Sequence, residues 1–445
     1  MVRVWLTTSG RAIGLDEQPP LALDMIGSAE SEGVITVDES RTYQEMDGFG
    51  ASLTDSAAWL IYTQLDATRR DALMRELFDP VDGIGISFLR QPMGATDITT
   101  GGLYSYDDRP RGQSDPDLVH FSIDHDLAYI IPVIKQALRL NPAIKVLATP
   151  WSPPGWMKTR DSMIGGRLKL EAYGVYAHYF VKFIQAYEAQ GVPIYAVTVQ
   201  NETLWTPLDY PGMLMSADEQ TEFIAGHLGP AFAAAGIQAK VLVYDHNWDH
   251  PEYPERILSD PTASPYIAGT AFHRYGGDPS AQSRVHDAFP DKDIYFTEGS
   301  TDVDISFQYM LETLMIDVPR HWAKSVVLWN IAYDHTGGPY LRPGGCAICR
   351  PLVTIDTERG TWARNTDYYA LGHLSKCVQP GAHRIASHTD GESAIRHVAF
   401  ANPNRSHVLI ALNTRPMQDT SFTVRCGALS YSYTLSGGAG ATFMW

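Results

Sequence analysis

Eight short apolar runs, each separated from the next by a longer stretch, occupy the middle of this 445-residue chain. This alternation is typical of parallel β-strands joined by crossover helices. The apolar runs cover residues 45–51, 86–92, 145–151, 194–202, 240–245, 268–275, 293–298 and 325–330. Helical spacing is found at residues 56–78, 127–140, 171–190, 217–235 and 305–323. Eight strands with intervening helices predict an α/β fold, a TIM (β/α)8 barrel.

The two ends of the chain follow a different pattern. Short runs parted by turn residues predict antiparallel strands at residues 395–400, 407–412, 421–425 and 431–435. Residues 2–7 and 34–37 also resemble strands without helices. We therefore predict a side β-sandwich domain built from both termini. The predicted domains are 1–40 and 379–445 for the sandwich and 41–378 for the barrel.

Charge and composition exclude several classes of partner. The chain has 34 Lys and Arg against 51 Asp and Glu, a formal charge of −17. So acidic a protein repels polyphosphate, which excludes nucleic acid as an expected partner. No apolar run approaches the ~18 residues of a membrane span, so we expect no integral membrane contact. The first residues, Met1-Val-Arg-Val-Trp-Leu6, lack the basic start, apolar centre and cleavage site of a signal peptide. The sequence leaves the oligomeric state open.

Cys346 and Cys349 form a C-x-x-C motif in a predicted loop. A zinc site would need a second pair at matching spacing, which the sequence lacks. A redox motif would normally open a helix, whereas this one lies between Gly345 and Pro351. The pattern predicts either a disulfide that pins the loop or two unpaired thiols.

Polar and aromatic side chains collect where the predicted barrel strands end. TIM-barrel active sites lie at the C-terminal ends of the strands. The fourth strand ends at Asn201 and Glu202, and the seventh ends at Glu298. The remaining strand ends and the residues shortly after them contribute Arg90, Asp97, Trp151, His273, Tyr275 and Trp329.

Two glutamates on one rim suit the hydrolysis of a glycosidic bond. One carboxylic acid must protonate the leaving oxygen, while a second carboxylate attacks or stabilises the anomeric carbon; retaining enzymes hold the two about 5–5.5 Å apart. Aromatic faces suit the C–H face of a pyranose, and an amide such as Asn201 can bind the 2-hydroxyl. The pattern predicts that Glu202 and Glu298 form a catalytic pair, with no cofactor and no metal.

Several independent motifs occur in a fixed order along nearly the whole chain. They include Asp47-Gly-Phe-Gly-Ala-Ser-Leu-Thr-Asp55, Phe88-Leu-Arg-Gln-Pro-Met93, Thr149-Pro-Trp-Ser-Pro-Pro154, Val199-Gln-Asn-Glu202, Phe272-His-Arg-Tyr275, Phe296-Thr-Glu-Gly299 and Leu371-Gly-His-Leu-Ser-Lys376. In these motifs the sequence resembles glycoside hydrolase family 30, the family of glucosylceramidase and β-1,6-glucanase. The resemblance implies a barrel with a side β-domain and the hydrolysis of β-glycosides with retention of configuration.

The resemblance also implies a role for each motif residue. Glu202 resembles the acid/base and Glu298 the nucleophile. The implied substrate-binding residues are Arg90, Asp97, Trp151, Asn201, His273, Tyr275 and Trp329. Tyr275 and His273 are expected to orient the nucleophile and border the sugar, and Arg90 to support the carboxylates from below. For Glu202 to hold a proton near neutral pH its pKa must be raised, by burial and by the charge of Glu298.

The implied substrate is a carbohydrate or glycoconjugate, namely a β-D-glucoside of the β-1,6-glucan, gentiobiose or glucosylceramide type. The resemblance also suggests a secreted or periplasmic protein. Linkage, leaving group and exo or endo action stay open. A β-xylosidase or β-fucosidase of the same family is an alternative at the level of substrate.

Alternatives from other classes also stay open. A non-catalytic carbohydrate-binding barrel would need the aromatic rim but no paired glutamates, and nothing specific points to a structural or interaction protein. A metal-dependent hydrolase could use His246 and His250, spaced four apart, with Asp245 and Asp249 nearby. Pro251 argues against a helix there, so the two imidazoles need not share a face.

Overall fold

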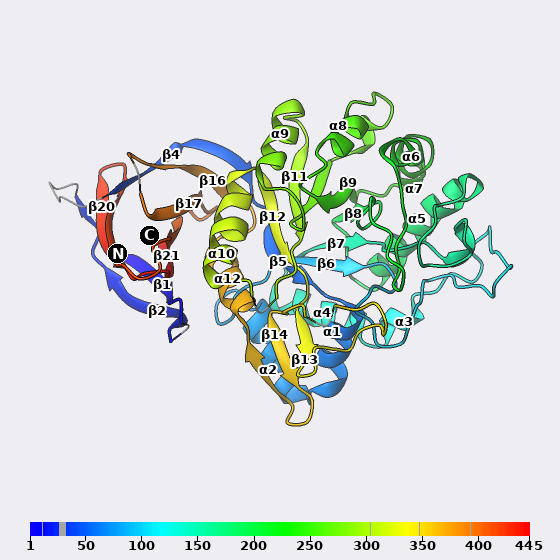
Figure 1. The fold of residues 1–445 in the computed structure, drawn as a ribbon, viewed down its shortest axis with the longest axis horizontal. Coiled ribbons are helices and arrows are strands. Elements are labelled where there is room, and N and C mark those ends of the chain that lie inside the picture. Colours follow the sequence, from blue (N-terminus) through cyan, green and yellow to red (C-terminus); the bar gives the residue numbers. More distant parts are fainter. Residues whose placement is uncertain (11, 26–32, 303, 347, 392) are drawn as a thin grey trace.

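Eight parallel strands close into a barrel, which confirms the predicted fold class. The computed structural model describes residues 1–10, 12–25, 33–302, 304–346, 348–391 and 393–445. The barrel strands are β5 (Gly48–Ser52), β6 (Phe88–Pro92), β7 (Lys145–Thr149), β8 (Ala196–Thr198), β9 (Lys240–Asn247), β10 (Gly269–His273), β11 (Asp293–Glu298) and β12 (Ala323–Leu328). Figure 1 shows the barrel beside a separate β-domain that contains both chain termini.

That second domain is built around a ten-stranded sheet from both ends of the chain. Its strand order is β2-β1-β21-β18-β17-β16-β4-β19-β20-β3. The strands are β1 (Val2–Thr7), β2 (Gly14–Leu21), β3 (Asp24–Met25), β4 (Val34–Glu45), β16 (His383–Thr389), β17 (Ile395–Ala401), β18 (His407–Asn413), β19 (Thr420–Cys426), β20 (Leu429–Leu435) and β21 (Gly440–Met444). The first and last of these pair antiparallel, with Trp5 opposite Thr442.

The boundary between the two domains differs from the predicted strands. β4 continues to Glu45, which pairs with His383 of β16, so the first barrel strand begins at Gly48 rather than at residue 45. Residues 38–45 are mostly polar and exposed, so their sequence lacks the alternation of apolar and polar residues that predicts a strand. The domain limits 1–40, 41–378 and 379–445 stay a prediction.

Helices cover the outside of the barrel in Figure 1. They are α1 (Asp55–Trp59), α2 (Ala67–Phe78), α3 (Asp124–Leu127), α4 (Ile130–Leu140), α5 (Tyr173–Ala189), α6 (Ala217–Phe223), α7 (Gly229–Ala235), α8 (Glu252–Leu258), α9 (Ser280–Ala288), α10 (Phe307–Tyr309), α11 (Val318–Arg320) and α12 (Thr366–Ser375). The predicted helix 56–78 is interrupted, because Asp66 leaves the helical conformation and caps α2 by accepting a hydrogen bond from Arg69 N. A small sheet, β13 (Ala332–Asp334), β14 (Val353–Asp356) and β15 (Thr361–Arg364), follows the last barrel strand and was not predicted.

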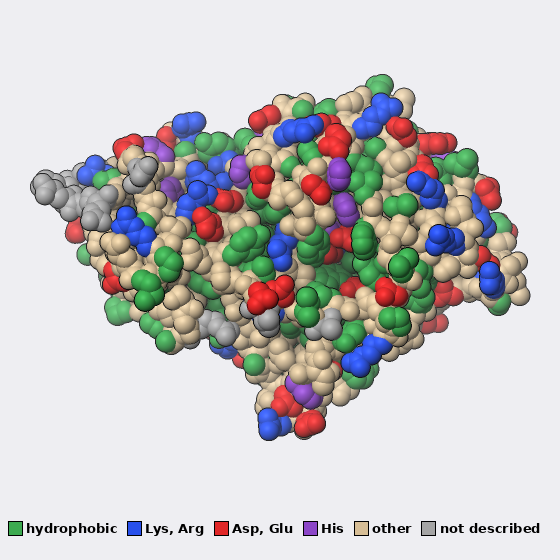
Figure 2. Space-filling model, in the orientation of Figure 1, with side chains coloured by type: hydrophobic (Ala, Val, Ile, Leu, Met, Phe, Trp, Pro, Cys, Tyr) green, Lys and Arg blue, Asp and Glu red, His purple; other side chains and the backbone are tan. Residues whose placement is uncertain are grey.

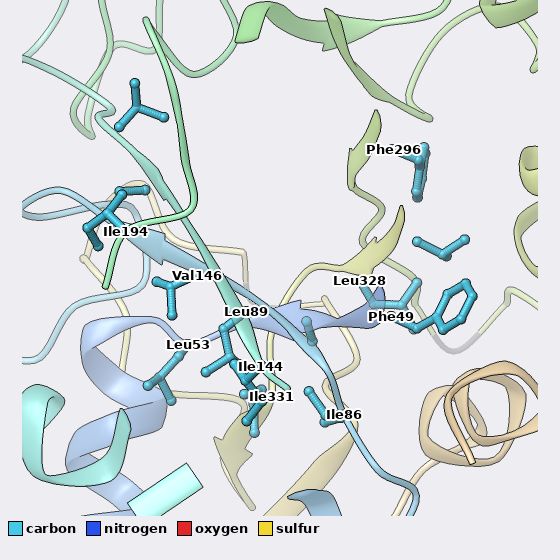
Figure 3. Packing of buried hydrophobic residues seen from close by; sticks show 14 of the residues in the cluster. Phe49, Leu53, Ile86, Leu89, Ile144, Val146, Ile194, Phe296, Leu328 and Ile331 are labelled. Carbon is cyan, nitrogen blue, oxygen red and sulfur yellow. The ribbon is translucent and has the colours of Figure 1, made fainter. Parts of the chain in front are cut away.

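Alternating side chains of the barrel strands fill two separate layers. On β6, Phe88 points into the barrel interior, where it packs with Leu147 and Tyr295. Its neighbour Leu89 points outward into the large core beneath the helices. Figure 3 shows this outer layer, with Leu89 among side chains contributed by several strands and loops. Burial of each such side chain contributes about 1.5–3 kcal/mol, so both layers hold the strand ends in fixed positions.

A buried histidine joins the barrel to the sandwich. His373 of α12 lies 2.9 Å from Thr442 Oγ1 through Nδ1 and 2.9 Å from Thr7 Oγ1 through Nε2. Burial lowers the pKa of His373 to about 3, so the imidazole is neutral in the folded protein. This bridge connects α12 to strands from both ends of the chain.

The neutral state of His373 makes stability depend on pH. In the unfolded chain the imidazole binds a proton near its ordinary pKa of 6.5, whereas in the folded chain it does so only near 3. The stabilisation is therefore complete above pH 6.5 and falls with decreasing pH, by at most about 1.4 kcal/mol per pH unit. We expect His373→Gln, measured by chemical unfolding from about pH 7 to 4, to lose stability less steeply than the wild type.

The control is His178→Gln, which replaces an exposed histidine of α5. It should retain the wild-type dependence on pH. Equal slopes for His373→Gln and the wild type would contradict the assignment.

Candidate active site

A cavity of about 410 Å³ opens at the ends of the barrel strands. Its wall consists of Asp97, Trp151, Asn201, Glu202, Trp205, Tyr210, His246, Asn247, Tyr275, Glu298, Ser300, Trp329, Cys346 and Cys349. Figure 2 shows charged side chains of both signs spread over the visible face, with hydrophobic side chains gathered around a depression near its middle. The cavity thus brings together seven of the nine site residues predicted from the sequence.

The two predicted glutamates lie close to each other in this cavity. One oxygen of Glu202 and one oxygen of Glu298 are within 4.8 Å. Glu298 is the last residue of β11, whereas Glu202 follows β8 with a positive φ of 49°. That uncommon conformation is held by hydrogen bonds from Glu202 N to Asp245 O and from Trp205 N to Glu202 O, each 2.9 Å long. Strained backbone held in this way is typical of functional sites.

Arg90 of β6 lies beneath the carboxylates and is fully buried. Its Nη1 donates to Glu298 Oε2 at 2.5 Å, and its Nη2 donates to Asn201 Oδ1 at 2.7 Å. The same Nη2 donates to Asp245 Oδ2 at 2.9 Å. A buried guanidinium needs such compensation, so Arg90 fixes the positions of all three partners.

Asp245 is a functional residue that the sequence considered only as a possible metal ligand. Besides the contact with Arg90, it accepts hydrogen bonds from Thr198 Oγ1 at 2.8 Å and Thr297 Oγ1 at 2.6 Å. Burial alone would raise its pKa, but Arg90 and His273 outweigh burial and hold the pKa well below its usual range. Asp245 is therefore an ionised anchor. The strand-end rule could have found it, because the predicted fifth strand ends at this residue.

His273 lies directly behind the pair of glutamates. Its Nε2 is 3.0 Å from Asp245 Oδ1, and its Nδ1 is 3.5 Å from Glu202 Oε1 and 3.9 Å from Glu298 Oε1. Burial opposes protonation, but Glu298, Asp245 and Glu202 together raise the pKa of His273 to about 9. The imidazole is therefore a cation at neutral pH.

Arg90 and His273 were both implied to bind substrate, but their side chains are fully buried and neither lines the cavity. Arg90 lies beneath the carboxylates, the place that the resemblance implies for it, and the contact of His273 with the sugar stays a prediction. They lie behind the carboxylates because each compensates a buried negative charge. Both contact the carboxylates from behind, whereas Tyr275 lines the cavity and donates its hydroxyl to Glu298 Oε1 at 2.7 Å.

The electrostatic environment of Glu202 differs from that of Glu298. Burial and the charge of Glu298 raise the pKa of Glu202, against the opposing effects of His273 and Arg90. Glu298, by contrast, accepts hydrogen bonds from Arg90 and Tyr275 on its two oxygens. This arrangement favours a protonated Glu202 beside a Glu298 carboxylate that Arg90 and Tyr275 hold in place.

Aromatic rings and one further carboxyl group complete the inner wall. The rings of Trp151 and Trp329 lie 5.2 Å apart, and the guanidinium of Arg90 is 4.7 Å from the Trp151 ring. Burial, together with the charges of Glu298 and Glu202, raises the pKa of Asp97 to about 8. Its carboxyl group can therefore donate as well as accept a hydrogen bond at neutral pH.

A buried carboxylate outside the cavity holds the loop that carries Asp97. Asp55 Oδ2 accepts hydrogen bonds from Thr100 N at 2.7 Å and Thr99 Oγ1 at 3.0 Å. Asp55 Oδ1 lies 2.7 Å from His125 Nε2 and 2.5 Å from Tyr129 OH. One carboxylate thus connects the loop to α3 and to the residue that precedes α4.

The metal hypothesis receives no support from these positions. Asp245 is buried and accepts a hydrogen bond from Arg90, whereas His250 is exposed and its Nδ1 lies 2.9 Å from Glu252 Oε1. Within the described parts of the chain, one group of side chains has the spacing of metal ligands, namely Glu202, His273 and Glu298. A protonated His273 has no lone pair to offer a cation, so this group suits proton transfer better than metal binding.

The C-x-x-C motif forms a disulfide that reaches the cavity. Cys346 and Cys349 are bonded, with their Cα atoms 5.5 Å apart, and both line the cavity wall. Of the two structures left open by the sequence, the loop pinned by a disulfide is the one observed.

The sequence matches known domains over both parts of the fold. Residues 46–378 match the glycosyl hydrolase family 30 TIM-barrel domain, and residues 381–443 match the family's beta sandwich domain. The chain belongs to glycosyl hydrolase family 30, which confirms the resemblance seen in its motifs. It is an O-glycosyl hydrolase.

Relatives include proteins of two named activities. The endo-1,6-beta-D-glucanase neg1 of Aspergillus fumigatus is 33% identical over 409 residues, which cover 87% of this chain and 82% of that protein. The lysosomal acid glucosylceramidase of Mus musculus is 29% identical, covering 93% and 83%. The solved structure of the endo-beta1,6-glucanase BT3312 has a TM-score of 0.91 and 32% identity, covering 100% of this chain and 99% of that one.

Among the described residues, none of the helices has the length and apolarity needed to cross a membrane.

Because Asp55 holds the Asp97 loop, its replacement should act on substrate binding. Asp55→Asn replaces one acceptor oxygen with an NH₂ group, so the bonds from the loop or from His125 are lost. We expect KM for a β-glucoside to rise about tenfold with a smaller change in kcat, the equivalent of about 1.4 kcal/mol of binding. Steady-state kinetics measures this directly.

The matched control is Asp71→Asn, which removes a half-exposed carboxylate of α2 that pairs with Arg75. It should leave KM unchanged. A destabilised Asp55→Asn enzyme with wild-type KM would show that the Asp55 contacts are structural only.

Proposed function

We propose that this protein hydrolyses β-D-glucosides with retention of configuration, with Glu298 as the nucleophile and Glu202 as the acid/base. The observation that supports this most directly is the separation of the two carboxyl groups, within 4.8 Å between their oxygens. Retaining pairs are about 5–5.5 Å apart, whereas inverting pairs are about 6.5–9.5 Å apart and leave room for a water molecule.

In the first step, a carboxylate oxygen of Glu298 attacks the anomeric carbon as the bond to the leaving oxygen breaks. Glu202 transfers its proton to that oxygen, so the leaving group departs as a neutral alcohol. Asn201 Oδ1 already accepts a hydrogen bond from Arg90. The side-chain amide nitrogen of Asn201 therefore donates to the 2-hydroxyl of the sugar. Trp151, Trp329 and Asp97 surround the sugar in this proposal.

In the second step, water replaces the leaving group. Glu202, now ionised, takes a proton from the water molecule. The water oxygen attacks the anomeric carbon, and the bond from that carbon to Glu298 breaks. Esterification of Glu298 removes the negative charge that raises the pKa of Glu202, so the ionised form needed here becomes more stable. Glu202 ends the cycle protonated.

The proposed substrate is a β-1,6-linked glucoside such as gentiobiose or a β-1,6-glucan. The named endo-1,6-glucanase relatives support this choice. Glucosylceramide is the second candidate, because the mouse glucosylceramidase matches over most of both chains. Asp97 favours glucose over xylose, since its carboxyl group can hold hydroxyls on the far side of the ring.

Removal of the nucleophile should change the reaction in a diagnostic way. We expect Glu298→Gly to lose essentially all turnover of gentiobiose. In the presence of azide and an activated β-glucoside, it should form the α-glucosyl azide, because the small anion enters the space left by the carboxylate. Proton NMR of the product measures the configuration; a β-azide from this variant would contradict the assignment.

The raised pKa of Glu202 predicts the alkaline limb of the pH profile. Since the acid must be protonated in the first step, kcat/KM should fall as pH rises through this pKa, which lies above the ordinary 4.5. Glu202→Ala should retain the first step for a substrate with a good leaving group, such as a dinitrophenyl glucoside. With that substrate the variant should lack the wild-type alkaline limb, and persistence of the limb would assign it to another group.

A further inference from the structure

Trp205 combines exposure with a place in the cavity wall. Its side chain is 54% exposed although it borders the same cavity as the two glutamates. Large aromatic rings left open to water beside a cavity are characteristic of ligand contacts. None of the roles implied by the family motifs involves this residue.

The indole of Trp205 is held in place although it is exposed. Its Nε1 donates to Tyr210 OH at 3.0 Å. Tyr210 also lines the cavity and packs against the buried cluster that contains Trp151 and Trp329. The ring therefore has a fixed position before any ligand binds, which reduces the entropy cost of contact.

The backbone places Trp205 on the leaving-group side of the site. Trp205 N donates to the carbonyl of Glu202, so the two residues close a single turn. Glu202 is the proposed proton donor to the leaving oxygen, whereas Glu298 and Tyr275 lie on the side of the attacked sugar. A ring on the same turn as the acid therefore lies next to the departing group.

A second loop borders this side of the cavity. The Cys346–Cys349 disulfide lines the cavity wall, and Gly344 of the same loop approaches Asp209 so closely that a Cβ would lie 2.8 Å from the Asp209 carbonyl oxygen. Asp209 belongs to the loop of Trp205 and Tyr210. The two loops are thus in contact, and together they bound the space outside the glutamates.

We propose that the indole of Trp205, fixed by Tyr210 and bordered by the loop of the Cys346–Cys349 disulfide, binds a sugar ring as the leaving group. This inference rests on the proposed function. It adds that the leaving group bound at Trp205 is a pyranose. The flat face of an indole matches the apolar C–H face of a pyranose. His246 and Asn247 in the same wall add polar groups for the sugar hydroxyls.

A lipid leaving group is the competing occupant. Leu204 and Leu208 beside Trp205 are 39% and 88% exposed and could contact alkyl chains. The net charge of −17 opposes approach to an anionic lipid surface, however, and the polar residues of the cavity wall favour a hydroxylated group. The test therefore includes a lipid substrate.

The experiment compares leaving groups that do and do not reach the indole. Gentiobiose carries a glucose leaving group, whereas β-glucosyl fluoride releases a fluoride ion that is too small to contact Trp205. We expect Trp205→Ala to lower kcat/KM for gentiobiose about tenfold or more while leaving that for the fluoride unchanged. Trp205→Phe should recover part of the loss, and Tyr210→Phe, which frees the indole, should show a smaller loss of the same kind.

The control variant is Leu208→Ala, on the same loop but outside the cavity wall. It should retain wild-type kcat/KM for gentiobiose and for the fluoride. Thermal unfolding of each variant checks that the fold is unchanged. We expect no large change, because the side chains of Trp205 and Leu208 are exposed.

A second readout uses the covalent intermediate alone. With the enzyme trapped by a 2-deoxy-2-fluoro-glucoside, glucose or gentiobiose should accelerate reactivation by transglycosylation in the wild type, since an acceptor sugar binds where the leaving group did. Trp205→Ala should lose this acceleration while its spontaneous reactivation by water stays the same.

The outcomes separate the two proposals. Failure of the wild type to hydrolyse any β-glucoside, the fluoride included, would overturn the proposed function. Wild-type activity on both substrates with an equal effect of Trp205→Ala on each would overturn the leaving-group assignment alone. A loss confined to glucosylceramide in vesicles would assign the indole to a lipid and also overturn the assignment.

Discussion

The guanidinium of Arg90 carries a positive charge in a position that water does not reach, and the geometry of the site depends on how that charge is compensated. Asp245, Glu298 and the carbonyl oxygen of the Asn201 side chain share its hydrogen bonds. A buried ion pair is favourable only when hydrogen bonds and opposite charges compensate both ions. Loss of one charged partner leaves the other charge buried and unpaired. Arg90 therefore connects β6 to the ends of β8, β9 and β11.

Charge balance in this cluster explains why two similar glutamates can take different roles. Arg90 and the protonated His273 supply two positive charges, and Asp245 and Glu298 supply two negative ones. Ionisation of Glu202 would leave the cluster with an excess negative charge in a buried site, which is why its pKa is raised. Once Glu298 is esterified, the balance becomes positive and favours the ionised Glu202. The same five groups thus support both proposed steps.

Much of this arrangement could be predicted from the sequence because periodicity and strand ends are local features. The eight apolar runs indicated the barrel, and the rule that active sites lie at strand ends selected Glu202 and Glu298. Edge strands were missed: β2 contains two prolines and has no fully buried residue, so it lacks the alternation of a half-buried strand. The resemblance implied a place for Arg90 below the carboxylates, but the full burial of His273 could not be predicted, since the sequence shows which residues end a strand but not how deeply each side chain lies.

Asp245 and Trp205 illustrate the same limit at the level of the site. The strand-end rule could have selected Asp245, but not its role as an anchor, because three strands bring Arg90, His273 and Thr297 around it and no local motif contains that relation. Trp205 belongs to a loop whose path depends on the left-handed conformation of Glu202 and on contact with the disulfide loop. Such long-range contacts have to be seen in three dimensions.

The protonation of Glu202 can be measured directly. Carbon-13 NMR of glutamate carboxyl groups, assigned with Glu202→Gln, would follow its titration in the free enzyme and in the enzyme trapped as a fluoroglucosyl ester. We predict a pKa above the ordinary 4.5 in the free enzyme and a lower pKa once the charge of Glu298 is gone. An ordinary pKa in the free enzyme, or the same pKa in both states, would contradict the claim that burial and the charge of Glu298 together hold the proton on Glu202.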